Sequence, residues 1–183
     1  MLWEVPPDRV KVIGNLVPPP LLALAARKAV ECTEHAVCVP ETLWHSLYPY
    51  QKDGVRRIVH QYKGRCLLAD EMGLGKTRQA LAVIAHYSCK TLVICPSFLQ
   101  TTWRRELEVH GNQATVCSYG TVPACSHAWE LVVVDEAHYL KSVDSCRTQA
   151  ILPLLLAAPH VLLISGTPCP NRPEELYPLL HAI

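Results

Sequence analysis

The sequence predicts an α/β fold: a doubly wound, mostly parallel sheet with helices on both faces. Three observations lead to this prediction. Short continuous runs of Val, Leu and Ile recur after residue 50, and such runs are typical of strands that helices cover on both sides. Amphipathic stretches with helical spacing separate these runs, which indicates right-handed strand–helix–strand crossovers. The chain has 183 residues, half of them hydrophobic, which is enough for one sizeable core.

The composition excludes several classes of protein. Charged residues make up 18% of the chain and mean hydropathy is +0.13, which excludes disordered, coiled-coil and collagen-like chains. A net charge of +1 excludes a highly basic nucleic-acid coat but permits a local basic groove. No apolar run approaches the roughly 20 residues that span a bilayer, so no membrane partner is expected. The nine cysteines are odd in number and include no Cys-x-x-Cys pair, which favours reduced thiols over disulfides or zinc.

The beginning of the chain differs from the rest. The first 50 residues hold seven of the 15 prolines, including the triplet at 18–20, which is typical of an extended polyproline II stretch. One helix is expected at Leu21–Glu31, where strong helix formers are dense. We therefore predict a lead-in arm over residues 1–45 and a single lobe over residues 46–183.

The elements of that lobe follow in order. Apolar residues at positions 55, 58, 59 and 62 have helical spacing and predict a helix over 51–62. Five strands are then predicted, the third of them the weakest: Arg65–Ala69, Thr91–Cys95, Ala114–Ser118, Leu131–Val134 and Val161–Ile164. Three helices are expected between them: Arg78–His86, Thr102–Val109 and Cys146–Leu156.

The strongest functional signal is the segment DEMGLGKT, between the first predicted strand and a helix. Gly73 and Gly75 allow a tight turn whose N–H groups face a phosphate chain at a helix N-terminus. Lys76 would reach the β- and γ-phosphates, and the Thr77 hydroxyl would bind Mg²⁺. The strict P-loop pattern has glycine where this chain has Asp70, and an incidental Gly-rich turn or a small P-loop kinase are the alternatives. The predicted nucleotide-binding residues here are Asp70, Glu71, Met72, Gly73, Leu74, Gly75, Lys76 and Thr77.

Two further motifs follow predicted strands. Asp135 and Glu136 come directly after the run Leu131–Val134, where carboxyl ends of parallel strands bind ligands. Asp135 would hold Mg²⁺ and Glu136 would orient and deprotonate the attacking water, although such a pair is also common in solvated turns. The segment SGTP follows the last strand. Its residues Ser165, Gly166 and Thr167, with His138 of the DEAH segment, are expected to couple the γ-phosphate site to the rest of the lobe; alone, SGTP is a common turn.

Together the segments DEMGLGKT, CPSFLQTTWRRE, DEAHYLKS and SGTPCPNRPEELY resemble the first, ATP-binding lobe of Swi/Snf-type superfamily 2 helicase-like ATPases. Within that group the chain is most similar to the annealing-helicase, or fork-remodelling, branch. The similarity runs from about Trp44 to the C-terminus. It implies a RecA-like P-loop lobe, with ATP and Mg²⁺ as cofactors. It also implies duplex or branched DNA as a partner and a second motor lobe in cis or in trans.

The resemblance assigns further residues by position. Gln51 matches the glutamine that recognises adenine. The segments that would touch the DNA backbone contain Pro96, Ser97, Trp103, Arg104, Ser118 and Tyr119. Arg105 could add a phosphate contact, and Lys141 resembles the family's lysine after DEAH. Asn171 and Glu175 fit the closing helix and are expected to be structural.

The chain also departs from the family pattern. The stretch between Trp103 and Asp135 is short, and the chain ends soon after SGTP, so a second lobe with its arginine finger is not expected within it. The predicted function is the ATP-binding lobe of a DNA-dependent ATPase, which would act in the nucleus in a eukaryote and otherwise inside the cell. The alternative is a non-catalytic nucleotide- or DNA-binding regulatory module. Annealing, remodelling and fork reversal remain equally open at this point.

Overall fold

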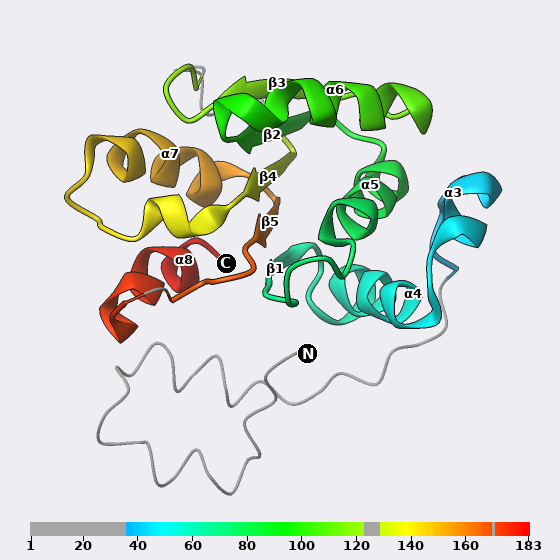
Figure 1. Ribbon diagram of the computed structural model, residues 1–183, viewed down its shortest axis with the longest axis horizontal. Helices are drawn as coiled ribbons and strands as arrows, with labels where there is room; N and C mark the ends of the chain where they lie inside the picture. Colours follow the sequence, from blue (N-terminus) through cyan, green and yellow to red (C-terminus); the bar gives the residue numbers. More distant parts are fainter. Residues whose placement is uncertain (1–35, 123–128, 170) are drawn as a thin grey trace, which may run out of the picture.

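A five-stranded, wholly parallel sheet forms the centre of the molecule (Figure 1). The structure is a computed structural model that describes residues 36–122, 129–169 and 171–183. In space the strands follow the order β1-β5-β4-β2-β3. Their bounds are β1 Arg65–Leu68, β2 Thr91–Cys95, β3 Thr115–Ser118, β4 Leu131–Asp135 and β5 His160–Ile164. The chain moves outward from β1 to β3 and then returns between β2 and β1, which makes the sheet doubly wound.

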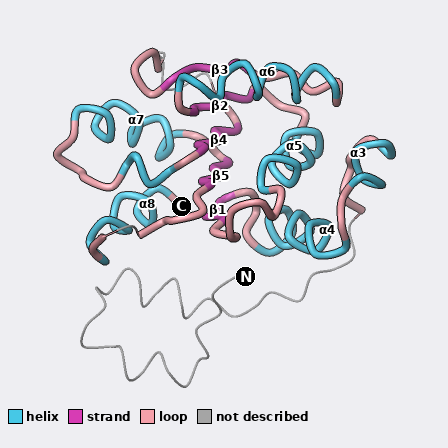
Figure 2. Tube along the Cα trace, in the orientation of Figure 1, coloured by secondary structure: helices cyan, strands magenta, loops and turns pink. Residues whose placement is uncertain are grey.

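Helices cover both faces of this sheet, with α4 and α5 on one side and α7 and α8 on the other (Figures 1 and 2). The α-helices are α3 Glu41–Ser46, α4 Pro49–Arg56, α5 Lys76–Tyr87, α6 Gln100–Val109, α7 Cys146–Ala157 and α8 Tyr177–Ala182. A π-helical turn, Arg57–Gln61, continues α4, and 3₁₀ turns lie at Ser97–Leu99, Ala137–Leu140 and Pro173–Leu176. No helix among the described residues is long and apolar enough to cross a membrane.

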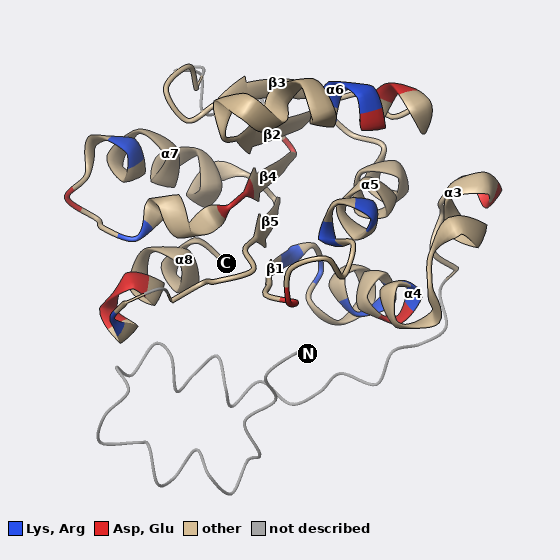
Figure 3. Cartoon of the chain, viewed as in Figure 1, with Lys and Arg blue, Asp and Glu red and all other residues tan. Residues whose placement is uncertain are grey.

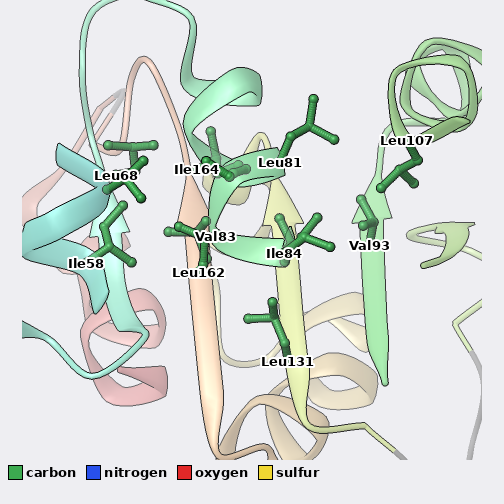
Figure 4. Close-up of a cluster of buried hydrophobic side chains, with 14 of the residues drawn as sticks. Ile58, Leu68, Leu81, Val83, Ile84, Val93, Leu107, Leu131, Leu162 and Ile164 are labelled. Atoms are coloured by element: carbon green, nitrogen blue, oxygen red, sulfur yellow. The ribbon is translucent and has the colours of Figure 1, made fainter. Parts of the chain in front are cut away.

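Alternate residues of the central strands face two separate apolar cores. Val93, Leu131, Leu162 and Ile164 pack with α4, α5 and α6 in the first core, which Figure 4 shows. The residues next to them along the strands, including Leu163, pack with α7 and α8 in the second. Because both faces are buried, β2 and β4 have no polar face, which is why they read as continuous apolar runs in the sequence.

The predicted elements of the lobe are confirmed, with bounds that differ by at most two residues in the strands and in the helices between them. The predicted helix over 51–62 is α4 together with its π-helical turn. The helix expected at Leu21–Glu31 lies outside the described residues. Helix α3 spans residue 45, and Leu43 and Leu47 are buried in the first core. The end of the predicted arm therefore packs on the lobe, and the boundary at residue 45 stays a prediction.

Candidate nucleotide-binding and catalytic site

The P-loop follows β1 and leads into α5 without a break. Gly73 and Gly75 have φ values of 84° and 72°, the left-handed region that glycine enters without steric cost. The Lys76 ammonium donates hydrogen bonds to the backbone oxygens of Asp70, at 2.7 Å, and Glu71, at 2.9 Å. The lysine thus folds back over the hollow of its own loop. This is the place that a phosphate chain would occupy at the start of α5.

Gln51 joins the start of α4 to the P-loop. Its side-chain nitrogen donates to the Leu74 backbone oxygen at 3.0 Å, and its oxygen accepts from the Tyr48 backbone N–H at 2.9 Å. The residue is only 2% exposed, and a Cβ at Gly75 would collide with its amide. One amide hydrogen and one lone pair remain unused by these two bonds. Adenine recognition by Gln51 therefore stays a prediction, and its structural role is to hold the P-loop against α4.

Asp135 and Glu136 lie at the carboxyl end of β4, the central strand, which β5 separates from the P-loop strand β1. Figure 3 shows acidic residues in red at this end of β4. The Asp135 carboxylate accepts a hydrogen bond from the Trp103 indole N–H at 2.8 Å and another from the Glu136 backbone N–H at 2.9 Å. Burial raises the pKa of the Asp135 carboxyl, while these two hydrogen bonds act in the opposite direction. Its partners thus help to keep a buried carboxylate ionised, as a cation ligand must be.

Glu136 has a strained backbone. Its φ of 55° places a residue other than glycine in the left-handed region, at a cost of about 1–2 kcal/mol. Strain of this kind persists only where the surroundings hold it, and it is concentrated at functional sites. The turn directs the Glu136 carboxylate to His138, whose Nδ1 lies 3.3 Å from a Glu136 carboxylate oxygen.

His138 connects the DEAH segment to the segment that follows β5. Its Nδ1 also lies 3.1 Å from the hydroxyl oxygen of Ser165, a fully buried residue. That hydroxyl in turn accepts the Thr167 backbone N–H at 3.2 Å. The pairing of β4 with β5 explains the contact, because Asp135 lies in register with Ile164 and the two following turns leave the sheet side by side.

Gly166 brings the same segment against the P-loop. A Cβ at this position would lie 2.8 Å from the Met72 side chain and 3.6 Å from the Lys76 ammonium nitrogen. Only a residue without a side chain leaves this approach open. The three motifs are therefore in contact at one edge of the sheet: the P-loop with SGTP, and SGTP with DEAH.

Three of the predicted DNA-contacting residues have buried side chains. Trp103 is 1% exposed, so its side chain does not reach the surface, and its indole holds Asp135 instead. Pro96 and Ser118 are also buried, and the Ser118 hydroxyl pairs with that of Thr121 at 3.0 Å. DNA contact at these three positions stays a prediction, and it would involve their backbone because their side chains are buried.

The other predicted contacts differ in how freely they face solvent. Ser97 is exposed, as are Arg105 and Arg104, but the Arg104 guanidinium already donates to the Gln100 side chain at 2.8 Å. The Tyr119 hydroxyl faces inward, toward the DEAH turn. DNA contact by Ser97 and Arg104 stays a prediction.

The segment after SGTP is held together by Glu175, and its structural role stays a prediction. Both Glu175 carboxylate oxygens accept hydrogen bonds from Asn171, each at 3.1 Å. The Lys141 ammonium lies 3.9 Å from the same carboxylate. Glu175 thus links the segment after SGTP to the turn after DEAH.

Sequence reasoning missed several contacts that support the site. The Gln79 amide donates to the Asp70 carboxylate at 2.9 Å, and the Tyr119 hydroxyl approaches the backbone of Asp135 and Glu136. Arg147 lies over the Tyr119 ring. No local pattern signals these contacts, because most of them join residues from different elements far apart in the chain.

The chain is similar in sequence to several known proteins. Residues 50–125 and 120–183 match the SNF2-related domain family. The chain is 33% identical over 178 residues to the DNA annealing helicase and endonuclease ZRANB3 of Mus musculus, covering 79% of this chain and 17% of the relative. It is 34% identical over 171 residues to the SWI/SNF-related matrix-associated actin-dependent regulator of chromatin subfamily A-like protein 1 of Xenopus tropicalis. This match covers 79% of this chain and 18% of the relative. The chain thus spans less than a fifth of the length of these relatives.

Solved structures share the fold. The SWI2/SNF2 ATPase core of Sulfolobus solfataricus, in complex with double-stranded DNA, superposes with a TM-score of 0.66 at 23% identity, covering 81% of this chain and 38% of that one. The UvsW helicase of bacteriophage T4 gives a TM-score of 0.59 at 16% identity, and the match covers 73% of this chain and 57% of the helicase chain. The predicted α/β fold, with its parallel sheet and helices on both faces, is confirmed.

Proposed function

The chain belongs to the SNF2-related domain family, and we propose that it is the ATP-binding lobe of a DNA-dependent ATPase that couples hydrolysis to movement on DNA. One observation carries the proposal: three motifs from distant parts of the sequence meet at one edge of the sheet. Lys76 lies against Gly166, and His138 joins Glu136 to Ser165. A small P-loop kinase needs the first of these motifs but not the other two.

The residues present fit ATP and Mg²⁺. The P-loop offers an ammonium group and left-handed glycines at a helix start, the chemistry that binds phosphate. Thr77 and Asp135 would hold Mg²⁺, because a hydroxyl and an ionised carboxylate are the hard oxygen ligands that this ion prefers. When bound, the ion would neutralise charge on the phosphate oxygens.

The chain's own residues have separate roles in this proposal. Lys76 would leave the carbonyl oxygens of its loop and bind the β- and γ-phosphates. The Glu136 carboxylate would orient the attacking water and accept its proton. His138 and Ser165 would transmit the state of that carboxylate to the segment after β5, through the contacts at 3.3 Å and 3.1 Å.

DNA, duplex or branched, is the proposed partner, together with a second motor lobe in cis or in trans. Support comes from the relatives, which include a DNA annealing helicase, and from a structural neighbour in complex with double-stranded DNA. An arginine finger raises phosphoryl-transfer rates by roughly 10³–10⁵, so we expect slow turnover without a second lobe. The site of action would be the nucleus in a eukaryote, since one relative is named a regulator of chromatin.

A non-catalytic module that binds nucleotide and regulates a partner is the second candidate. The two candidates agree on nucleotide binding and differ on hydrolysis. A first experiment therefore addresses binding alone.

We would titrate the chain with a fluorescent ATP analogue, with Mg²⁺ and with EDTA. Lys76→Ala is expected to weaken binding by about 10–100-fold, because a hydrogen bond to a charged group contributes about 1.5–3 kcal/mol. Glu136→Gln serves as the matched control and should bind as the parent does, since its role is in the reaction. Equal affinity of the parent and Lys76→Ala would show that the P-loop assignment is wrong.

A further inference from the structure

The Tyr119 hydroxyl group connects the turn after β3 to the DEAH turn. The Tyr119 oxygen lies 2.7 Å from the Asp135 backbone oxygen and 3.0 Å from that of Glu136. Its one hydrogen therefore faces two carbonyl oxygens on either side of the strained Glu136 backbone. The Tyr139 N–H donates to the same Glu136 oxygen at 3.0 Å, which closes the turn from the other side.

The Tyr119 ring is itself held in place. The Arg147 guanidinium, which comes from α7, lies 5.4 Å from the centroid of the Tyr119 ring and 5.3 Å from that of Tyr139. The two rings are 5.4 Å apart, and Tyr139 stacks on His138 at 4.8 Å. Cation–π and aromatic contacts of this kind orient a ring without removing its hydroxyl from the carbonyls.

The partners of the hydroxyl fix its role as a hydrogen-bond donor. A backbone carbonyl accepts only, so the hydrogen bond has one possible direction.

We propose that Tyr119, clamped by Arg147 and Tyr139, is a positioning residue that holds the Glu136 backbone in its left-handed conformation for the hydrolytic step. This inference rests on the proposed function. It assigns Tyr119 to the reaction, where the family resemblance assigns it to a DNA-contacting turn. Because Ser118 and Tyr119 belong to one turn, a ligand that moves this turn also moves the carbonyl oxygens around Glu136.

The main test is Tyr119→Phe, which keeps the ring and removes the hydroxyl. The kcat for ATP hydrolysis should fall by on the order of tenfold to a hundredfold, since small displacements of a reacting group have effects of this size. The dissociation constant of the nucleotide should stay within about twofold, because Lys76 and the P-loop are untouched. A merely structural role would lower affinity, stability and rate together. Tyr177→Phe is the matched control, since that ring stacks on His181, outside the site.

A second variant changes the clamp and leaves the hydroxyl in place. Arg147→Gln removes the cation between the two rings, so we expect a smaller loss of kcat with the nucleotide affinity again unchanged. An Arg147→Gln variant that lost nucleotide affinity but kept its kcat would contradict the proposal.

Amide hydrogen exchange gives a readout that does not need turnover. The Glu136 N–H is bonded to its neighbour's carboxylate and the Tyr139 N–H to the Glu136 oxygen, so both should be protected. Tyr119→Phe should raise the amide exchange rate in the peptide 131–140 by about threefold or more. The exchange rate in the peptide that contains β1 and the P-loop should not change.

The outcomes separate the two claims. A parent chain that bound no nucleotide would refute the proposed function, whatever the exchange data showed. A parent that hydrolysed ATP, beside a Tyr119→Phe variant with equal kcat, would refute the role of Tyr119 alone. If the parent bound ATP without turnover, unchanged exchange in the variant would refute the positioning role, and faster exchange would support it.

Discussion

Asp135 is a buried carboxylate whose charged form is favoured by two hydrogen bonds. A carboxylate that leaves water loses hydration, and its pKa rises unless hydrogen bonds favour the charged form. Here a tryptophan indole, which can only donate, and a backbone N–H each bond one of its oxygens. The carboxylate is also oriented by these two bonds, so the lone pairs that remain have fixed directions.

Trp103→Phe tests this role at the residue scale. The variant keeps an aromatic ring in the core but removes the donor to Asp135. Partners of metal ligands typically affect metal affinity by 10–100-fold, so the Mg²⁺ concentration that half-saturates nucleotide binding should rise by about tenfold. Trp44→Phe makes the same change away from Asp135 and should leave the Mg²⁺ requirement as it is. A Trp103→Phe variant with the parent's Mg²⁺ dependence would show that the indole serves packing only.

At the scale of elements, Arg65 fastens two helices to the first strand. Its guanidinium donates to the backbone oxygens of Ala158, Leu155 (3.1 Å) and Ala182 (2.5 Å), at the ends of α7 and α8. The last carbonyl groups of a helix have no partner within it, and a cation near them also interacts favourably with the helix dipole. One side chain thus satisfies orphan acceptors of both helices that cover the second core.

Arg65→Met should therefore destabilise the fold. The long apolar stem is retained, but the helix ends lose their donor, and buried unsatisfied acceptors cost about 1–3 kcal/mol. Thermal unfolding should occur about 4–8 °C lower for a loss near 2 kcal/mol in a domain of this size. Arg105→Met, on the exposed face of α6, should change the free energy of unfolding by less than about 0.5 kcal/mol. If the two variants unfolded at the same temperature, the proposed fastening would be wrong.

At the scale of the whole molecule, the fold and the place of the site could be predicted, and the side-chain contacts could not. The strands β2 and β4 are buried on both faces, so their composition alone identifies them. The P-loop follows β1 and the carboxylates lie at the end of β4, and parallel pairing brings the ends of these strands to one edge of the sheet. The prediction of the fold and of the position of the site thus depends only on local sequence pattern and on the order of the elements.

The remaining features depend on contacts between distant residues. The bond from Trp103 to Asp135 spans 32 positions and the approach of Tyr119 to Glu136 spans 17. From the sequence alone, a tryptophan in an amphipathic helix is equally compatible with the core and with the surface. The left-handed Glu136 likewise has no signal in its own sequence, because glutamate ordinarily avoids that conformation.

The measurement that tests the central claim most directly is steady-state ATP hydrolysis by the purified chain, alone and with duplex or forked DNA. Lys76→Ala and Glu136→Gln would be assayed beside it. The proposed function predicts slow hydrolysis that DNA stimulates and that both substitutions abolish. Hydrolysis no faster than that of Lys76→Ala, with or without either DNA, would contradict it.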